Sequence, residues 1–257
     1  MPASLQVAFN CDQTRAAFHL FHPKGNIITA EIIAALSAAL DSVSENPHLK
    51  LITIEGEGSD FSFGASVPEH TAAEIERVLP AMHELIYAWL DVDAVTAAIV
   101  RGRCLGGGFE LAMACDFIFA SEDATFGLPE IALGVFPPTA CAILPARVGS
   151  ARATSAIVTG TPRSAAAWRD MGLVEFVSRG ATLSADVDAW FNQHLASRSA
   201  AALRYAAAAA RLGLRAHVRA VLPQLERLYL NDVMRTEDAA EGVAAFLEKR
   251  APRWKDR

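Results

Sequence analysis

One stretch of the chain decides the fold: GGGFELAMACD, residues 106–116. It follows the apolar run Val95–Val100 and combines a triple glycine with the start of a helical pattern. Glycine lets the backbone approach a ligand closely, and the first N–H groups of a helix have no partner within the helix. Such a helix start also attracts developing negative charge. The stretch therefore predicts either a turn that stabilises an anion or a tight strand-to-helix turn without a ligand.

Strand and helix patterns alternate on both sides of this stretch, and strand patterns stop near residue 183. Strands are predicted at residues 5–9, 16–21, 49–55, 95–100, 117–120 and 125–126, and helices at residues 29–44 (N-cap Thr29), 72–91, 200–211 and 223–235. This order predicts an α/β fold. We divide it into a core with the active site, residues 1–182, and a C-terminal helical subdomain, residues 183–257.

The composition is that of a packed globular protein, with 52% apolar and 20% charged residues. No run reaches the roughly 18 to 20 apolar residues of a membrane helix, and no basic-then-apolar leader is visible, so we expect a cytoplasmic protein without a membrane partner. The net charge of −6 predicts no nucleic-acid partner. Neither the histidines nor the cysteines (Cys11, Cys104, Cys115 and Cys141) form a metal pattern, so we expect reduced thiols, no metal and no cofactor.

Two glutamates stand among apolar residues at a spacing of 20 positions. Glu110 lies two residues after the triple glycine, and Glu130 lies in LPEIAL, residues 128–133. Burial raises the pKa of a carboxyl whereas a helix start lowers it, so the sequence leaves the net direction open. Each residue, taken alone, is either an ion-paired or capping acid or a candidate for acid–base catalysis. The segment FSFGAS, residues 61–66, also brings a glycine to the end of a predicted strand and offers a second N–H group.

Taken together, these motifs resemble the enoyl-CoA hydratase/isomerase (crotonase) family. The resemblance is based on FSFGA at residues 61–65, on GGGFELAMACD, and on FGLPEI at residues 126–131 with Gly134. It extends to LPARVG at residues 144–149 and to FLEKR at residues 246–250. The resemblance implies a spiral of ββα turns that forms two stacked sheets with surrounding helices. It also implies that the C-terminal helical subdomain mediates assembly as a trimer or a dimer of trimers.

The resemblance further assigns roles to residues. It implies an oxyanion hole for the thioester carbonyl from the N–H groups of Ala65 and Gly107, and catalysis by Glu110 and Glu130. A hydro-lyase that adds water to an unsaturated acyl-CoA fits the pair of acids, because one can deprotonate water while the other protonates the enolate. The resemblance places the substrate and CoA path along Lys24, Gly25, Asn26, Ala65, Ser66, Val67, Pro68, Gly106 and Gly107. Coenzyme A is then part of the substrate.

The chain departs from the hydratases of linear enoyl-CoA after Gly134, where it reads VFPPTAC instead of a glycine-rich turn. Pro138 has no N–H to donate to a water molecule. This turn, with SV and EH at residues 66–67 and 69–70, most resembles the cyclohexa-1,5-diene-1-carbonyl-CoA hydratases of anaerobic benzoyl-CoA degradation. That resemblance implies 6-hydroxycyclohex-1-ene-1-carbonyl-CoA as the product. We therefore place Phe136, Pro138 and His70 in the acyl pocket, although His70 is also compatible with an exposed helix start.

Three alternatives stay open from the sequence. The first is an ordinary short-chain enoyl-CoA hydratase of fatty-acid oxidation, and the second is an isomerase. The third is a non-catalytic CoA-binding homologue, because a fold does not fix a function. The retained pair of glutamates argues against the third.

Overall fold

Six strands form the main sheet, in the order β1-β2-β3-β4-β6-β9. The computed structural model describes residues 4–10 and 12–257, so Cys11 lies outside it. The strands are β1 (Ser4–Phe9), β2 (Arg15–Phe21), β3 (Leu51–Gly56), β4 (Val95–Val100), β6 (Phe117–Ser121) and β9 (Phe176–Ser178). All neighbours pair in parallel except β1 and β2. The predicted strands are thus confirmed to within a few residues.

A second, smaller sheet carries the turns of the candidate site. It has the order β5-β7-β8, with β5 (Arg103–Leu105), β7 (Thr125–Gly127) and β8 (Arg163–Ser164). Strands β5 and β7 are parallel, and Leu105 pairs with Gly127. The two sheets and the surrounding helices are the architecture that the family resemblance implies.

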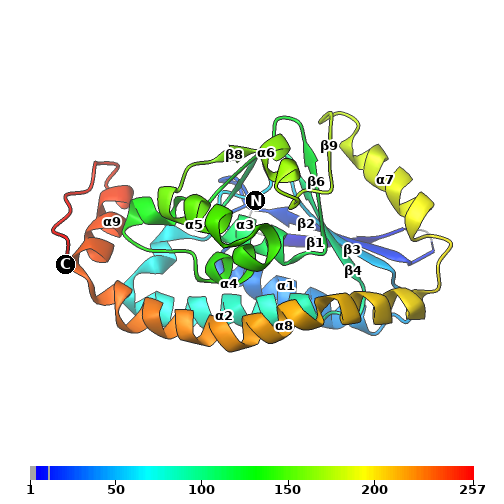
Figure 1. The fold of residues 1–257 in the computed structure, drawn as a ribbon, viewed down its shortest axis with the longest axis horizontal. Coiled ribbons are helices and arrows are strands. Elements are labelled where there is room, and N and C mark those ends of the chain that lie inside the picture. The colour runs from blue at the N-terminus through cyan, green and yellow to red at the C-terminus, as the bar shows by residue number, and fades with distance from the viewer. Residues whose placement is uncertain (1–3, 11) are drawn as a thin grey trace.

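Helices cover both faces of the main sheet (Figure 1). They are α1 (Ala30–Ser44), α2 (Ala72–Asp91), α3 (Gly107–Ala114), α4 (Pro138–Val148), α5 (Ser150–Thr159), α6 (Ala165–Asp170), α7 (Leu183–His194), α8 (Ala200–Asn231) and α9 (Glu237–Leu247). Short 3-10 turns span Val67–His70, Pro129–Leu133 and Val233–Arg235. Thr29 caps α1, as predicted, because its side chain accepts a hydrogen bond from the N–H of Ile32.

Strand β4 shows why strands of the main sheet are apolar along their length and do not alternate with polar residues. Its side chains alternate between two cores: Ala98 and Val100 pack in the main core, whereas Ala97 and Ile99 pack under α7. Helix α7 begins at Leu183, and its buried side chains pack on one face of the sheet. The division of the chain at residue 183 separates the strands from the last helices, and its status as a domain boundary stays a prediction.

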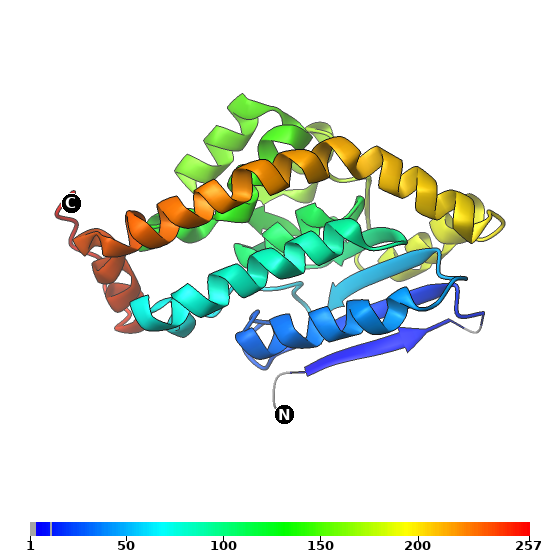
Figure 2. The ribbon, with the colours of Figure 1, turned by 90° about the horizontal axis from the view of Figure 1, so that it is seen from below.

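The C-terminal region differs from the sequence prediction in one respect. The predicted helix at residues 200–211 and most of the predicted helix at residues 223–235 belong to one helix of 32 residues, α8, which ends at Asn231, and Pro223 lies inside it. A proline inside a helix removes one backbone hydrogen bond, and the helix continues here although Pro223 interrupts its hydrogen bonds, because Val218 and Leu222, which precede the proline, are buried in the main core. Helix α8 lies beside α2, which lies beside α1 (Figure 2). This row of helices places the end of α8 over the candidate site.

Candidate active site

The N–H groups of Ala65 and Gly107 lie close together at the junction of two segments. Residues 61–66 run along β5, because the N–H of Ser62 donates to the carbonyl of Arg103 and the N–H of Leu105 donates to the carbonyl of Ser62. This pairing carries Ala65 to the start of α3. A β-carbon added at Gly107 would lie only 3.3 Å from the backbone nitrogen of Ala65. The two positions predicted for an oxyanion hole are therefore in contact.

Both N–H groups are available to a ligand. The bridge between Ile28 and Ala65 uses the carbonyl of Gly64 and the N–H of Ser66, so the N–H of Ala65 points away from Ile28. Gly107 is the first residue of α3 and has no acceptor within the helix. Among the described residues, neither N–H has a hydrogen-bond partner.

Two glycines make this junction possible. Gly64 has φ +98° and Gly106 has φ +47°, a region that L-residues with side chains rarely adopt. Any side chain would also collide: a β-carbon at Gly64 would lie 2.9 Å from the carbonyl oxygen of Leu105, and one at Gly106 would lie 2.5 Å from Oε1 of Glu130. The side chain of Glu130 therefore lies directly against the turn at Gly106.

The pairing of β5 with β7 brings the two glutamates together. The carboxyl ends of these parallel strands are adjacent, and the N–H of Gly106 donates to the carbonyl of Gly127 at 2.9 Å. Glu110 then follows on the first turn of α3, and Glu130 follows on the 3-10 turn after β7. Strand register thus places residues that are 20 positions apart at one edge of the smaller sheet.

Glu110 is a buried carboxyl with strong local support. Its side chain is 7% exposed, and Oε1 accepts a hydrogen bond of 2.8 Å from the N–H of Ala140. Burial raises the pKa of Glu110 to about 7, although the N–H groups of Ala140 and Thr139 lower it. These donors belong to the first turn of α4, which begins at Pro138. The proline turn therefore supplies no N–H itself but starts the helix that stabilises the Glu110 carboxylate.

Glu130 is buried like Glu110 but lacks comparable hydrogen-bond support for its carboxylate. Its Oε2 is buried and has no hydrogen-bond partner among the described residues. Burial and then the charge of Glu110 raise the pKa of Glu130 to about 8. The supported carboxylate of Glu110 and the unsupported carboxyl of Glu130 favour a state with one proton, on Glu130, near neutral pH.

Comparison with known proteins identifies the family. The model of the enoyl-CoA hydratase/isomerase family matches residues 13–257. The chain belongs to this family. Similar proteins include cyclohexa-1,5-dienecarbonyl-CoA hydratase of Thauera aromatica, which is 39% identical over 253 residues and covers 98% of this chain and 97% of that protein. A probable enoyl-CoA hydratase of Bacillus subtilis is 32% identical, with 97% and 98% covered.

Solved structures agree with this assignment. An enoyl-CoA hydratase from Mycobacterium avium subsp. paratuberculosis K-10 superposes with a TM-score of 0.87 at 26% identity, and each chain is fully covered. The crotonase fold is confirmed, and with the curated relatives it identifies this chain as a hydro-lyase of the enoyl-CoA hydratase type.

A small cavity connects the candidate catalytic groups of this hydratase. Its wall contains Ala65, Gly107, Glu110 and Glu130, and it also contains the three residues predicted for the acyl pocket, His70, Phe136 and Pro138. The remaining wall consists of Ile28, Ile33, Ile75, Val78, Leu79, Met82, Pro137 and Tyr229. The sequence analysis missed this second set, because helical spacing marks apolar faces without saying which of them line a cavity.

His70 lies at the cavity and not at a freely exposed helix start. Its Nδ1 lies 2.8 Å from the carbonyl oxygen of Ser66, and burial lowers the pKa of the ring. Ser66 is itself buried, and its N–H donates to Ile28. Val67 and Pro68 continue into the same 3-10 turn, and Pro68 is exposed. Their predicted contact with the substrate stays a prediction.

Lys24, Gly25 and Asn26 line a different hollow, together with Phe63. The Asn26 side chain is buried and donates to the carbonyls of Glu57 and Asp60, so its observed bonds hold the turn together. The exposed Lys24 is the group of this turn that is free to meet a phosphate. A role in CoA binding stays a prediction for all three residues.

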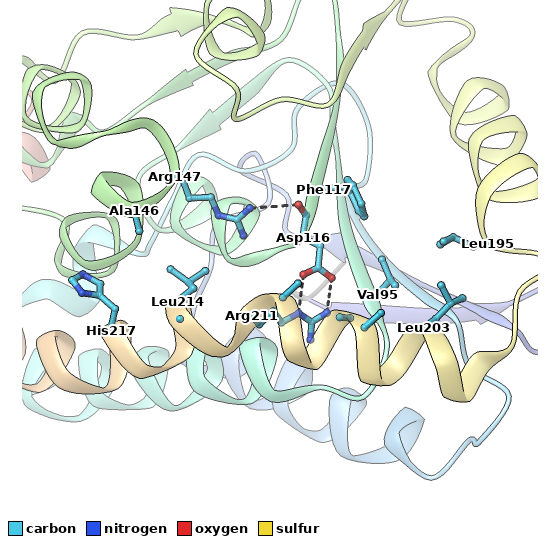
Figure 3. A pocket seen from close by; sticks show the side chains of 14 residues that line it. Val95, Asp116, Phe117, Ala146, Arg147, Leu195, Leu203, Arg211, Leu214 and His217 are labelled. Carbon is cyan, nitrogen blue, oxygen red and sulfur yellow. Dashed lines mark hydrogen bonds and ion pairs between the residues drawn. The ribbon is translucent and has the colours of Figure 1, made fainter.

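A larger hollow of about 600 Å³ lies between α8 and the segment that follows α3 (Figure 3). Its charged groups are already paired: Nε of Arg211 donates to Oδ1 of Asp116 at 2.7 Å, and Arg147 donates to the carbonyls of Cys115 and Asp116. Arg211 also donates to the carbonyl of Val92 at 2.7 Å. These bonds fasten α8 to the core, and we assign the hollow no catalytic role.

Proposed function

We propose that this hydratase adds water to cyclohexa-1,5-diene-1-carbonyl-CoA and forms 6-hydroxycyclohex-1-ene-1-carbonyl-CoA, in the anaerobic degradation of aromatic compounds through benzoyl-CoA. One observation carries the proposal: two buried carboxyls that differ in hydrogen-bond support lie beside two free N–H groups in an apolar cavity that Pro137 and Pro138 help to line. The similarity to the Thauera aromatica enzyme of that name supports the choice of substrate.

In the proposed reaction, the thioester oxygen accepts hydrogen bonds from the N–H groups of Ala65 and Gly107. Negative charge develops on this oxygen when water attacks, and each preorganised donor of this kind contributes roughly 3 to 4 kcal/mol in the transition state. The donors are fixed by strand pairing and by the helix start, so little reorganisation is needed during the reaction.

We assign the base to Glu110 and the acid to Glu130. Glu110 takes a proton from water as the oxygen bonds to the β-carbon, because its carboxylate is the one stabilised by the first turn of α4. The electrons of the double bond move through the α-carbon to the thioester oxygen. Glu130 then returns a proton to carbon, because its unsupported carboxyl is the one that holds a proton.

The cyclic diene changes where that proton goes. The charge extends through the second double bond to the far end of the diene, so protonation there gives a formal 1,4-addition. The product keeps one double bond conjugated to the thioester. The turn of Phe136, Pro137 and Pro138 lies in the cavity wall and is where the pocket differs from a glycine-rich turn.

A substrate panel tests the proposal. We expect kcat/KM for the cyclic dienoyl thioester to exceed that for crotonyl-CoA by at least about tenfold, or roughly 1.4 kcal/mol. The regiochemistry of the product, measured by NMR in deuterated water, checks the 1,4-addition. A preference for crotonyl-CoA would favour the alternative, a short-chain enoyl-CoA hydratase of fatty-acid oxidation. Binding of both thioesters without turnover of any enoyl-CoA would favour a non-catalytic homologue.

We further propose that the protein works in the cytoplasm, without a metal or a cofactor, as a trimer or a dimer of trimers. None of the described helices is both long and apolar enough to cross a membrane. The helical spacing of Leu222, Leu225, Leu228 and Tyr229 predicts an apolar assembly surface on α8, and this prediction is wrong for Leu222 and Tyr229, which are buried within the subunit. Leu228 is 47% exposed, and Tyr205 and Leu212 of the same helix are 74% and 65% exposed. These three exposed side chains support self-association through α8.

A further inference from the structure

Tyr229 reaches the active site from the last turns of α8. It is 2% exposed and lines the same cavity as Glu110 and Glu130. Its ring packs edge to face on Phe136, with centroids 5.4 Å apart and planes at 71°. Nearby, Nδ1 of His83 on α2 lies 2.6 Å from Oε2 of Glu226, which holds this end of α8 against α2 (Figure 2). The tyrosine is therefore held in place by contacts on two sides.

Hydrogen-bond donors are scarce in this cavity. Among its lining residues, the polar side chains are His70, Glu110, Glu130 and Tyr229. A carbonyl oxygen only accepts, so the bond from Nδ1 of His70 to Ser66 places the ring proton on Nδ1. The other ring nitrogen is then an acceptor, and the lowered pKa of His70 keeps the ring neutral. Apart from a protonated carboxyl, the Tyr229 hydroxyl is the one side-chain donor that these residues offer.

The Tyr229 hydroxyl is suited to act as a donor. Burial raises its pKa, and the charges of Glu130 and Glu110 raise it further, so the group keeps its proton. Within residues 4–10 and 12–257, no hydrogen bond of the subunit engages this hydroxyl. Because Tyr229 lines the cavity, an oxygen of the substrate or of the attacking water can accept a hydrogen bond from this hydroxyl.

We propose that Tyr229 contacts the reacting oxygen, and that its O–H donates a hydrogen bond to the water before addition and to the new hydroxyl group after it. Water can give one proton to Glu110 while its oxygen accepts from Tyr229, which fixes the attacking atom in place. In the reverse reaction the same hydrogen bond stabilises the leaving oxygen. Pro137 and Pro138, which have no N–H, leave this task to a side chain.

The proposal rests on the hydratase activity but not on the identity of the acyl group. Tyr229→Phe removes only the oxygen and keeps the ring against Phe136. Tyr87→Phe is the matched control, because it makes the same change on α2, at a residue that does not line the cavity. Both variants are compared with the wild type on crotonyl-CoA and on the cyclic dienoyl thioester. The substrate preference of the wild type tests the assigned acyl group, and the ratio of variant to wild-type activity on each substrate tests the role of Tyr229.

Two readouts decide. We expect Tyr229→Phe to lower kcat by at least about tenfold with KM nearly unchanged, as for an interaction that matters mainly in the transition state. We also expect the substitution to weaken the binding of 3-hydroxybutyryl-CoA by at least about fivefold more than the binding of butyryl-CoA, because only 3-hydroxybutyryl-CoA carries the new oxygen. The hydroxylated and unhydroxylated cyclohexene thioesters form a second such pair. Equal weakening of both members of a pair, or a kcat within about twofold of wild type, would overturn the proposal.

Discussion

Glu130→Gln should stabilise the folded protein at alkaline pH while it abolishes most of the activity. The carboxyl of Glu130 has a pKa of about 8 against an ordinary value of 4.5, because it is buried beside Glu110. A raised carboxyl pKa costs no stability below the unfolded value, and the cost grows as pH rises toward the folded value. At about 1.4 kcal/mol for each pH unit, the full cost above pH 8 is at most about 5 kcal/mol. Glutamine is never charged and avoids this cost.

Urea denaturation at pH 5.5, 7 and 9 measures the effect. Protein concentration is held constant, because unfolding of an oligomer depends on it. We expect the free energy of unfolding of Glu130→Gln, relative to wild type, to rise with pH by several kcal/mol between pH 5.5 and 9. Glu76→Gln, at an exposed position of α2, is the control and should show no such trend. A change of less than about 1 kcal/mol in the relative stability would mean that Glu130 is not desolvated in solution and would refute the reasoning.

Three further predictions concern the same site and the assembly. Glu110→Gln should lower kcat by at least about a hundredfold and leave thioester binding intact, as steady-state kinetics and isothermal titration will show; a variant with near-wild-type turnover would exclude Glu110 as the base. In wild type, kcat/KM should fall below about pH 7, where Glu110 is protonated, and above about pH 8, where Glu130 loses its proton; a flat profile from pH 6 to 9 would contradict the one-proton state. Light scattering at micromolar concentration should give the mass of three or six subunits, and a monomer of 27.5 kDa would refute the expected trimer or dimer of trimers.

The sequence predicted the parts of the site that depend on local pattern. The triple glycine, the apolar surroundings of Glu110 and the 20-residue spacing to Glu130 identified the family, and the helix start with a free N–H at Gly107 follows directly from the glycines. The contact between Ala65 and Gly107 could be expected only by resemblance. It depends on residues 61–66 running along β5, a long-range pairing that no local pattern specifies.

The protonation of the two acids could not be predicted, because it depends on distant parts of the chain. Glu110 receives its hydrogen bond from Ala140, 30 positions later, whereas Oε2 of Glu130 receives none from the described residues. The sequence shows that both carboxyls lie among apolar residues, but it does not show which of them meets a helix N-terminus. That difference is what distinguishes a base from an acid in otherwise similar surroundings.

The place of Tyr229 in the cavity wall could not be predicted either, for a related physical reason. Regular apolar spacing shows that a helix has an apolar face, but the same face can cover a partner subunit or the helix's own active site. In this chain Asp116, the last residue of the stretch at residues 106–116, helps to hold α8 against the core. Asp116 binds Arg211, and the helix then runs about 27 Å from Arg211 to Tyr229. Because α8 binds Asp116 through Arg211 and packs on Phe136 through Tyr229, the stretch that builds the oxyanion hole also helps to hold Tyr229 in the wall of the same cavity.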